Sequence, residues 1–412
     1  MSVVSLAAER AANKLPIYLD NQASTPIDPR VLDAMLPYFT EQFGNPHSES
    51  HVYGKNAMAA IEAARGDVAR LINADPREIV FTSGATEANN LALKGAARFA
   101  RAHPSAGRPP RDHIVTLATE HKCVLESVAA LEREGFATSV LPVEPDGRVS
   151  LDRVAAAFGE RTLLVSVMAA HNEIGVIQPL AEIGALCRAR GVLFHTDAAQ
   201  AFGKIPLDVE AMRIDLMSIS GHKIYGPKGI GALYVRRRPR VRLEPLIDGG
   251  GQERGLRSGT LPAPLCVGLG EAAALAAGAM EAEAARLKKM RDRLQQTLLR
   301  RVPGVHVNGD REHRLPGNLN LSFPGLTALA LIDACPSIAI STGSACTSAA
   351  VEPSYVLRAL GLSEALANAS IRLGLGRFTT EAEVDFAIEA LAAAAERLYA
   401  ERGVTQPESA PT

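Results

Sequence analysis

The sequence predicts an α/β fold, with a mostly parallel mixed sheet flanked by helices and a smaller α+β domain after it. The first observation is that short apolar segments alternate with segments of helical periodicity from about residue 78 to 235. The second is that polar residues follow successive apolar segments, where the carboxyl ends of parallel strands would meet. The third is that 412 residues, 47% of them hydrophobic, are enough for two or three domains with sizeable cores.

The segments before the sheet are predicted to be short. Residues 15–20 form an apolar run that ends in a polar turn, which is typical of an extended segment. Apolar residues at helical spacing predict a helix over residues 29–39, with Asp28 as its cap. The same periodicity predicts a second helix over residues 55–72.

A loop is expected between these two helices, over residues 44–51. Its Gly-Asn-Pro start disfavours a helix there. His47 and His51 are four residues apart, a spacing that would suit a metal ion on a helix, but no third ligand is near. We therefore expect loop structure here, and we predict no resident metal in the protein.

Seven short apolar segments predict the strands of the main sheet. Turn residues bound them, and helical periodicity occupies several of the intervening stretches. The predicted strands are 78–81, 113–118, 138–142, 162–168, 192–195, 216–220 and 231–235. The predicted helices are 88–100, about 124–134, 151–158 and 180–190.

The remainder is predicted to form the smaller domain, which a long Ala-rich helix over about 263–300 connects to the sheet. The large domain is then residues 29–280, and the small domain is residues 1–28 with 281–412. Residues from about 403 to 412 contain Pro, Ser and Gln and are predicted to be a disordered tail. The other expected elements are strands near 305–307, 317–323 and 369–373 and helices near 326–334, 353–360 and 380–400.

Composition disfavours several classes of function. The formal net charge is −1, so nothing points to nucleic acid or to an anionic membrane surface. The arginine-rich run at residues 236–240 is interpreted as a solvated loop, and no apolar run is long enough to span a bilayer. The five cysteines are odd in number and lack CxxC spacing, which favours a reducing compartment. The first residues lack a hydrophobic signal segment, and Glu9 and the shortness of the segment count against the alternative of a mitochondrial transit peptide. We therefore expect a cytoplasmic protein.

The turn at residues 82–87 follows a predicted strand and precedes a predicted helix. A glycine-containing turn of this kind brings free backbone N–H groups and the positive end of a helix dipole together, which suits an anion such as phosphate. Ser83 and Thr86 would add hydroxyl donors, and ordinary capping by one of them is the alternative. GxxxxGK[ST] and a GxGxxG after a strand do not occur, so the usual nucleotide sites lose support.

Lys223 lies on the turn after the apolar run 216–220. Ligands of α/β sheets bind beyond the carboxyl ends of the strands, where low-dielectric walls disfavour a charged amine. A neutral lysine amine can form a Schiff base with a carbonyl. Asp197, at the end of the preceding apolar strand, could pair with a protonated ring nitrogen. These two groups are the protein's half of pyridoxal phosphate chemistry, and a solvated surface lysine is the alternative.

Other polar residues follow the predicted strands in chain order, which points to one crevice. His121 has such a position, where its ring could stack on a planar cofactor, although a lone histidine is more often structural. The set comprises Thr86, His121, Asn172, Asp197, Gln200, Ser220, His222 and Lys223.

Residues 341–350 are ten small residues in a row, with Cys346 among them. No side chain there is large enough to anchor the segment in a core. Most free cysteines are small buried hydrophobes, but Cys346 lies in a polar context that allows thiolate chemistry, and a mobile thiol could travel between two sites. The buried interpretation is applied to Cys123, Cys187, Cys266 and Cys335.

Jointly, these motifs resemble those of the cysteine desulfurases, pyridoxal-phosphate enzymes with the aspartate-aminotransferase-like fold (fold type I). The resemblance covers the chain from Leu15 to about Leu398. The Cys346 segment is similar to that of the group with a long catalytic-cysteine loop, which includes the housekeeping iron–sulfur enzyme and the nitrogen-fixation enzyme. The segments that carry the resemblance are 81–87, 119–122, 172–175, 220–231, 257–260 and 343–348.

The resemblance implies a role for each candidate site residue. Lys223 would hold pyridoxal 5'-phosphate as a Schiff base and move protons, and Asp197 would pair with the ring nitrogen. Gln200 would hydrogen-bond the ring hydroxyl, while His121 would stack on the ring and act as an acid or base. The implied phosphate ligands are Ala85, Thr86, Ser220, His222 and, from the partner subunit of a homodimer, Thr260.

For the reaction, the resemblance implies conversion of L-cysteine to L-alanine. Asn172, which also contacts the cofactor, and Arg372 would hold the substrate carboxylate, since a guanidinium binds that group bidentately. Cys346 would take the sulfur as a persulfide and pass it to an acceptor such as an iron–sulfur scaffold protein. A transient contact of Cys346 with an iron–sulfur cluster is the only metal contact implied.

The chain departs from the family pattern at Ala170-His171, at Asn21-Gln22 and in its C-terminal tail. The tail leaves the acceptor open between general cluster assembly, nitrogen fixation and tRNA thiolation. The alternative functions are a related pyridoxal-phosphate lyase or aminotransferase, such as a selenocysteine lyase, and a catalytically idle scaffold with this fold.

Overall fold

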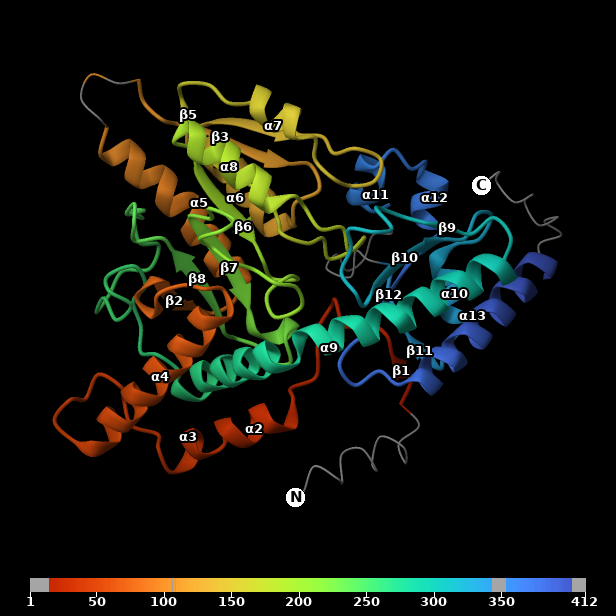
Figure 1. The fold of residues 1–412 in the computed structure, drawn as a ribbon, viewed down its shortest axis with the longest axis horizontal. Coiled ribbons are helices and arrows are strands. Elements are labelled where there is room, and N and C mark those ends of the chain that lie inside the picture. The colour runs from red at the N-terminus through yellow and green to blue at the C-terminus, as the bar shows by residue number, and fades with distance from the viewer. Residues whose placement is uncertain (1–14, 105–106, 108, 343–352, 402–412) are drawn as a thin grey trace.

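The computed structural model describes residues 15–104, 107, 109–342 and 353–401, which form two units side by side (Figure 1). Helix α9 (Ala263–Arg301) runs from one unit into the other. Its first half packs in the core of the larger unit, through residues such as Leu269, and its second half packs in the core of the smaller unit, through residues such as Leu294.

The sheet of the larger unit has seven strands in the order β2-β8-β7-β6-β5-β3-β4. The ladders from β4 through β3, β5 and β6 to β7 are parallel, and β8 is antiparallel to both β7 and β2. The predicted mostly parallel sheet is therefore confirmed, and the carboxyl ends of β2, β3, β5, β6 and β7 lie at one edge. The strands are β2 (Ile79–Thr82), β3 (His113–Leu117), β4 (Ala137–Leu141), β5 (Thr162–Ser166), β6 (Leu193–Asp197), β7 (Leu216–Ser220) and β8 (Gly231–Val235).

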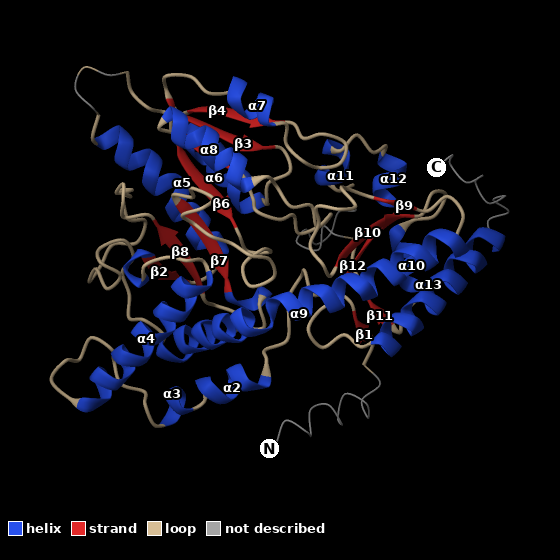
Figure 2. Cartoon of the chain, viewed as in Figure 1, coloured by secondary structure: helices blue, strands red, loops and turns tan. Residues whose placement is uncertain are grey.

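Helices cover both faces of this sheet (Figure 2). Alternate strand residues point to opposite faces, so Met217 packs in the core formed with α4, α8 and α9, whereas Leu216 packs in the core formed with α5 and α6. Strands β5, β7 and β8 are buried along their whole length for the same reason. The covering helices are α4 (Val52–Leu71), α5 (Ala85–Ala102), α6 (Lys122–Arg133), α7 (Leu151–Ala156) and α8 (Leu180–Arg190).

The smaller unit contains an antiparallel sheet in the order β12-β10-β9, together with the parallel pair β1–β11. The apolar faces of α9 and α13 pack over its core. Its strands are β1 (Ile17–Tyr18), β9 (His306–Val307), β10 (Asn318–Ser322), β11 (Ile338–Ala339) and β12 (Ser370–Gly374). Its helices are α10 (Ala328–Asp333), α11 (Tyr355–Ala359), α12 (Glu364–Asn368) and α13 (Glu381–Glu401).

The first helical segment differs from the prediction. The expected helix over 29–39 divides into α2 (Pro29–Met35) and α3 (Pro37–Thr40), because Pro37 has no N–H to continue the hydrogen-bond ladder and is suited to a first helical position. The predicted cap is confirmed, since the Asp28 side chain accepts a hydrogen bond from the Arg30 N–H.

One of the two histidines that raised the question of a metal, His51, has a structural use. The His51 Nδ1 accepts a hydrogen bond from the Gly54 N–H and so caps α4, which starts three residues earlier than predicted. Within the described ranges, no group of three or more His, Cys, Asp or Glu side chains is arranged to hold a metal ion.

Glu271 interrupts the apolar part of helix α9, so no uninterrupted apolar run there is long enough to span a bilayer, as expected. By length and average composition α9 is nevertheless apolar enough to cross a membrane, alone among the described helices. However, 44% of its most apolar window is buried inside the protein, and its contacts reach α2, α4 and α13. Packing of the two cores therefore accounts for its apolar residues.

Candidate active site

A cavity of about 580 Å³ lies at the carboxyl edge of the parallel strands. Residues from five strand ends, from the N-terminal segment and from β12 of the smaller unit converge on it. Ten of the predicted site residues line it, namely Ala85, Thr86, His121, Asn172, Asp197, Gln200, Ser220, His222, Lys223 and Arg372.

Lys223 ends a short 3-10 turn, Gly221–Lys223, directly after β7. Its Nζ donates hydrogen bonds to the main-chain oxygens of Gln22 and Ala23, each at 2.7 Å. The turn is tight, because a Cβ at Gly221 would lie only 2.9 Å from the Pro227 carbonyl oxygen. Gln22 and Ala23 were not predicted as site residues, although the departure at Asn21-Gln22 was a local signal.

Asp197 ends β6 and is almost fully buried. Its carboxylate accepts hydrogen bonds from Asn89 Nδ2 at 2.7 Å and from the Ala199 N–H at 2.9 Å. Two such donors stabilise an ionised carboxylate inside the protein. Asn89, on α5, was not predicted as a site residue. The only signal for it in the sequence was its polar side chain on the buried face of that helix.

His121 is the N-cap of α6, and its Nδ1 accepts a hydrogen bond from the Cys123 N–H at 3.2 Å. In the neutral ring this leaves the proton on Nε2. Burial lowers the pKa of His121; the positive charge of Lys223 lowers it further, and the negative charge of Asp197 opposes the shift. The ring is therefore neutral at physiological pH and carries an N–H donor on the nitrogen that does not cap the helix.

Cys123 does not fit the prediction of a core cysteine. It is partly exposed and lines the cavity, with its Sγ 3.0 Å from the His121 Nδ1, because the turn that caps α6 brings both side chains to the strand edge. Burial of its thiol, with the nearby charge of Asp197, raises its pKa to about 12, so it stays protonated. The other three predictions are confirmed by the buried positions of Cys187, Cys266 and Cys335.

The anion-binding turn starts α5, an 18-residue helix whose N-cap is Gly84. Gly84 has φ +151°, which favours glycine, and no side chain caps the first amides of the helix. The side chain of His222 approaches from the lysine turn, where burial first and the charge of Lys223 second lower its pKa to about 4. Glu87 accepts a hydrogen bond from the Ser83 N–H and pairs with Arg257 at 3.0 Å, which ties the 249–260 loop to this turn.

Arg372 reaches the cavity from β12 of the smaller unit and is 2% exposed. Its Nη1 donates to the Asn172 carbonyl oxygen at 3.0 Å, and its Nη2 pairs with Asp20 at 2.7 Å. Because Asn172 follows β5 of the larger unit, this arginine joins the two units at the cavity.

The predicted residue Cys346 lies outside the described residues. Near the cavity, Ser341 Oγ donates to Asp20 at 3.1 Å, and the Ser341 main chain bridges to Arg372; Ser354 Oγ donates to Glu173 at 2.6 Å. The described chain on both sides of residues 343–352 is thus anchored to residues next to the predicted substrate ligands. Thr260 is exposed and is not among the residues that line the cavity of its own chain.

The cavity residues fit pyridoxal phosphate. An amine, Lys223, is available for the aldehyde, and a buried carboxylate, Asp197, for the ring nitrogen. The uncapped amides of α5 suit the phosphate, since a helix N-terminus attracts anions. The volume of about 580 Å³ lies in the range of ordinary cofactor sites.

His171 is the departure at Ala170-His171 and ties two strand ends together. Its Nε2–H donates to the Thr119 carbonyl oxygen at 2.8 Å, and its Nδ1 accepts from the Glu173 N–H at 3.0 Å. The Nδ1 atom can accept a hydrogen bond only in the neutral ring, and burial lowers the pKa of His171 to about 4. The unfolded chain, with an ordinary histidine pKa near 6.5, therefore binds more protons between pH 4 and 6.5.

We expect His171 to make the protein less stable in acid. Its folded-state pKa is depressed, so its contribution is present above about pH 6.5 and is lost as the pH falls toward 4. The shift corresponds to about 3 kcal/mol. The difference in the free energy of unfolding between wild type and His171→Gln, measured by urea denaturation, should shrink by up to that amount from pH 7 to pH 4. A constant difference over this range would contradict the assignment.

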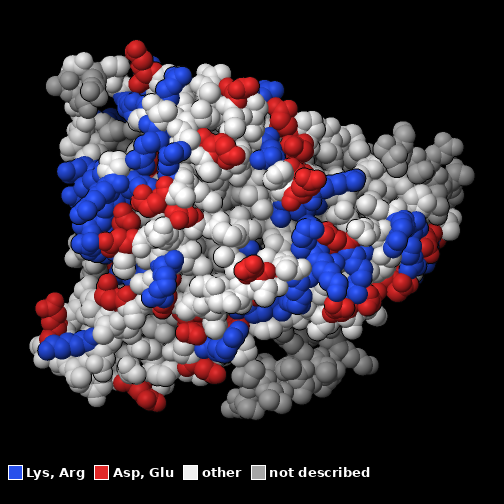
Figure 3. All heavy atoms as spheres, in the orientation of Figure 1, with Lys and Arg blue, Asp and Glu red and all other residues white. Residues whose placement is uncertain are grey.

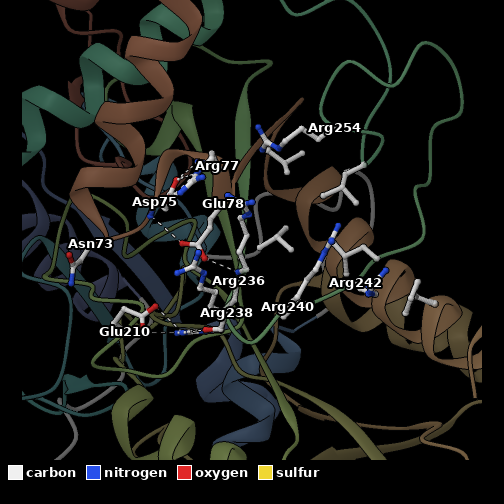
Figure 4. A pocket seen from close by; sticks show the side chains of 17 residues that line it. Asn73, Asp75, Arg77, Glu78, Glu210, Arg236, Arg238, Arg240, Arg242 and Arg254 are labelled. Atoms are coloured by element: carbon white, nitrogen blue, oxygen red, sulfur yellow. Dashed lines mark hydrogen bonds and ion pairs between the residues drawn. The ribbon is translucent and has the colours of Figure 1, made fainter. Parts of the chain in front are cut away.

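A second cavity, of about 560 Å³, lies at the opposite end of the sheet, where β8 ends, and arginine side chains line it (Figure 4). Basic side chains gather at the left edge of the surface in Figure 3, on the side where Figure 1 shows β2 and β8. In the described part of the chain no lysine lines this cavity. It therefore lacks the amine that an aldehyde cofactor requires.

Arg236 corrects the interpretation of residues 236–240 as a solvated loop. Its side chain is 3% exposed and pairs with Glu210 at 2.8 Å and with Asp215 at 3.3 Å. A buried guanidinium needs such partners, and its long stem packs well beside the sheet. The interpretation is confirmed for Arg237, Arg238 and Arg240, which are exposed.

Comparison with known proteins identifies similar chains. The model of the family Aminotransferase class-V matches residues 17–386, which include every described site residue. A cysteine desulfurase IscS of Rickettsia felis is 57% identical over 384 residues, covering 93% of this chain and 92% of that relative. A cysteine desulfurase of Pongo abelii is 59% identical over 374 residues, covering 91% of this chain and 80% of that relative.

Solved structures agree with these matches. A NIFS-like protein superposes with a TM-score of 0.84 at 37% identity, covering 93% of this chain and 99% of that structure. A structure described as SspA in complex with cysteine superposes with a TM-score of 0.76 at 39% identity, covering 88% of this chain and 100% of that structure. The similarity therefore extends over both units and across the cavity between them.

Proposed function

The chain belongs to the class-V aminotransferase family and is a pyridoxal-phosphate-dependent cysteine desulfurase, and from this premise we propose that it delivers the sulfur of L-cysteine through Cys346 to an acceptor protein for iron–sulfur cluster assembly. One observation carries the proposal. The cavity joins Lys223, Asp197 and Arg372, and the described chain on either side of the Cys346 segment is anchored next to it.

The larger unit supplies the groups that would hold the cofactor. When bound, pyridoxal phosphate provides an electron sink for the substrate carbon that carries the amino group. Lys223 Nζ supplies the amine that captures the aldehyde and afterwards carries protons. Asp197 would pair with the ring nitrogen, and the first amides of α5 would bind the phosphate together with Ser220 and His222.

The smaller unit would position the substrate. Arg372 holds the carboxylate of L-cysteine, and its contacts with Asn172 and Asp20 fix the plane of the guanidinium. His121, neutral and with a proton on Nε2, offers a donor beside the ring.

Sulfur transfer then needs a thiol. Cys346 gives up its proton and its Sγ attacks the substrate sulfur. The S–S bond forms as the C–S bond breaks, and the electron pair stays with the carbon. That carbon takes a proton, which leaves L-alanine and a Cys346 persulfide, and the outer sulfur passes to the thiol of an acceptor. Mass spectrometry of Cys346 after mixing with L-cysteine, with and without an iron–sulfur scaffold protein, tests the proposal; a persulfide that never forms there would refute it.

We also propose a homodimer, supported by exposed apolar side chains that extend from the end of α2 through α3 and the following loop to the start of α4. Phe43 is 65% exposed, and the centroid of its ring lies 5.7 Å from the centroid of the Tyr53 ring, which is itself exposed. Clustered exposed apolar residues of this kind mark association surfaces. A second copy would also explain why Thr260 is exposed on its own chain, because its hydroxyl would bind the cofactor phosphate in the partner subunit's site. The neighbouring exposed residues are Leu36, Phe39 and Val52.

A charge on this surface is expected to separate the subunits. Phe43→Glu should convert the dimer to monomer at micromolar concentration, because it buries a carboxylate in an apolar contact. Light scattering coupled to gel filtration measures the mass, and Phe386→Glu, at an exposed position on α13, is the matched control that should remain dimeric. A monomeric wild-type protein would contradict the proposal.

The cysteines that favour a reducing compartment also support a cytoplasmic location, which cell fractionation can test.

A further inference from the structure

A chain of hydrogen bonds leads from a second lysine to Lys223. The turn after β6 is helical in its hydrogen bonds, so Gln200 and Lys204 lie on the same side, four residues apart. Lys204 Nζ donates to Gln200 Oε1 at 3.3 Å, and Gln200 Nε2 donates to the Gln22 carbonyl oxygen at 2.8 Å. That same oxygen accepts from Lys223 Nζ at 2.7 Å.

These contacts decide which way the Gln200 amide faces. The side-chain amide has one acceptor atom and one NH₂ group with two donors. Lys204 occupies the acceptor, and the Gln22 oxygen uses one of the donors. A flipped amide would place oxygen against oxygen at Gln22 and NH₂ against the amine at Lys204. Because Gln200 lines the cofactor cavity, its second N–H remains for an acceptor there.

The surroundings of Lys204 make its amine sensitive to pH. It lines a small cavity of about 30 Å³ together with Glu283 of α9 and the Tyr225 ring. Burial lowers the pKa of Lys204 to about 7; the charges of Lys223 and Arg372 lower it further, and that of Glu283 opposes the shift. An amine retains an N–H in either protonation state, so the contact with Gln200 survives while the charge near the cavity changes.

We propose that Lys204 is a positioning residue, which holds the Gln200 amide so that its free N–H faces the ring oxygen of pyridoxal phosphate. The proposal rests on the proposed function, because it requires the cofactor to be bound at Lys223. An N–H donor at the ring oxygen and the positive charge of Lys204 beyond it both lower the pKa of the nitrogen that Lys223 supplies, so this nitrogen loses its proton more easily. Lys204 thereby adjusts the pH at which the bound cofactor changes its protonation state.

The test is a pH titration of the visible absorption band of the purified holoenzyme. Lys204→Met, which keeps the length of the side chain, should raise the midpoint of the titration by about 0.5–1 pH unit, since both the donor alignment and the cation are lost. Lys204→Arg keeps an N–H donor and a positive charge, so its midpoint should differ from that of wild type by no more than half of the shift seen in Lys204→Met. Lys288→Met, an exposed lysine on α9, is the control for loss of one charge and should leave the midpoint unchanged.

A double-mutant cycle separates positioning from general loss of structure. Gln200→Met should raise the midpoint, and adding Lys204→Met should raise it little more, because the lysine acts through the amide. Additive shifts, or a Lys204→Met midpoint equal to that of wild type, would overturn the proposal even if the variant melts earlier. A wild-type protein with no visible band would instead refute the proposed function, so the two failures are distinguishable.

Discussion

Replacing Lys223 with alanine is expected to lower the rate of cysteine desulfuration by at least ~10³-fold, which corresponds to about 4 kcal/mol of lost transition-state stabilisation. Lys223 is the amine that captures the cofactor and the group nearest to carry protons afterwards, so both functions disappear together. The Gln22 and Ala23 carbonyl oxygens lose the donor that Lys223 Nζ now provides, although Gln22 still accepts from Gln200 Nε2. The measurement is alanine formation from L-cysteine at saturating pyridoxal phosphate.

The same cavity provides a matched control for this variant. Lys228 also lines the cavity but is exposed, and none of the predicted roles falls on it. Lys228→Ala should therefore keep most of the activity, which separates loss of the amine at Lys223 from loss of positive charge. Borohydride reduction followed by peptide mass spectrometry should attach the cofactor to Lys223 in wild type. Attachment at Lys228, or full activity of Lys223→Ala, would show that the assignment is wrong.

The convergence of the site could be predicted because it depends on local signals. Each strand of the main sheet is a short apolar run, and parallel strands bring their carboxyl ends to one edge whatever the details of packing. Ser220, Asp197 and Asn172 end or follow such runs, so their order along the chain was enough to bring them together. Whether each one performs its predicted role remains a prediction.

Long-range contacts could not be predicted in this way. Asp20 pairs with Arg372, and Gln22 accepts from Lys223, across 352 and 201 residues of sequence. No periodicity or turn signal connects such positions, because the contacts form only when segments that are far apart in the sequence pack together in the folded protein. Arg236 shows the same limit at a single residue, since an arginine looks solvated in sequence until its buried carboxylate partners are known.

Cys346→Ser is expected to abolish sulfur transfer while leaving the cofactor in place. Serine keeps the shape of the side chain but its hydroxyl is a far weaker nucleophile than a thiolate, so the S–S bond cannot form. Alanine formation should fall by at least ~10³-fold, about 4 kcal/mol, and no persulfide should appear by mass spectrometry. The visible band of the bound cofactor should match that of wild type, because its proposed ligands are unchanged.

Cys123→Ser is the control that makes this result specific, because among the described cysteines it is Cys123 that lines the cavity. Its pKa of about 12 keeps it protonated, and its Sγ is held near His121 Nδ1 and Asn89 Nδ2. A protonated thiol is a poor nucleophile, so this variant should retain most of the activity. If activity instead followed Cys123 and survived in Cys346→Ser, the reacting thiol would be the one already inside the cavity. The persulfide would then form on a thiol inside the cavity, where the thiol of an acceptor protein could not reach it. That result would contradict the proposed direct transfer of sulfur from this enzyme to an acceptor protein.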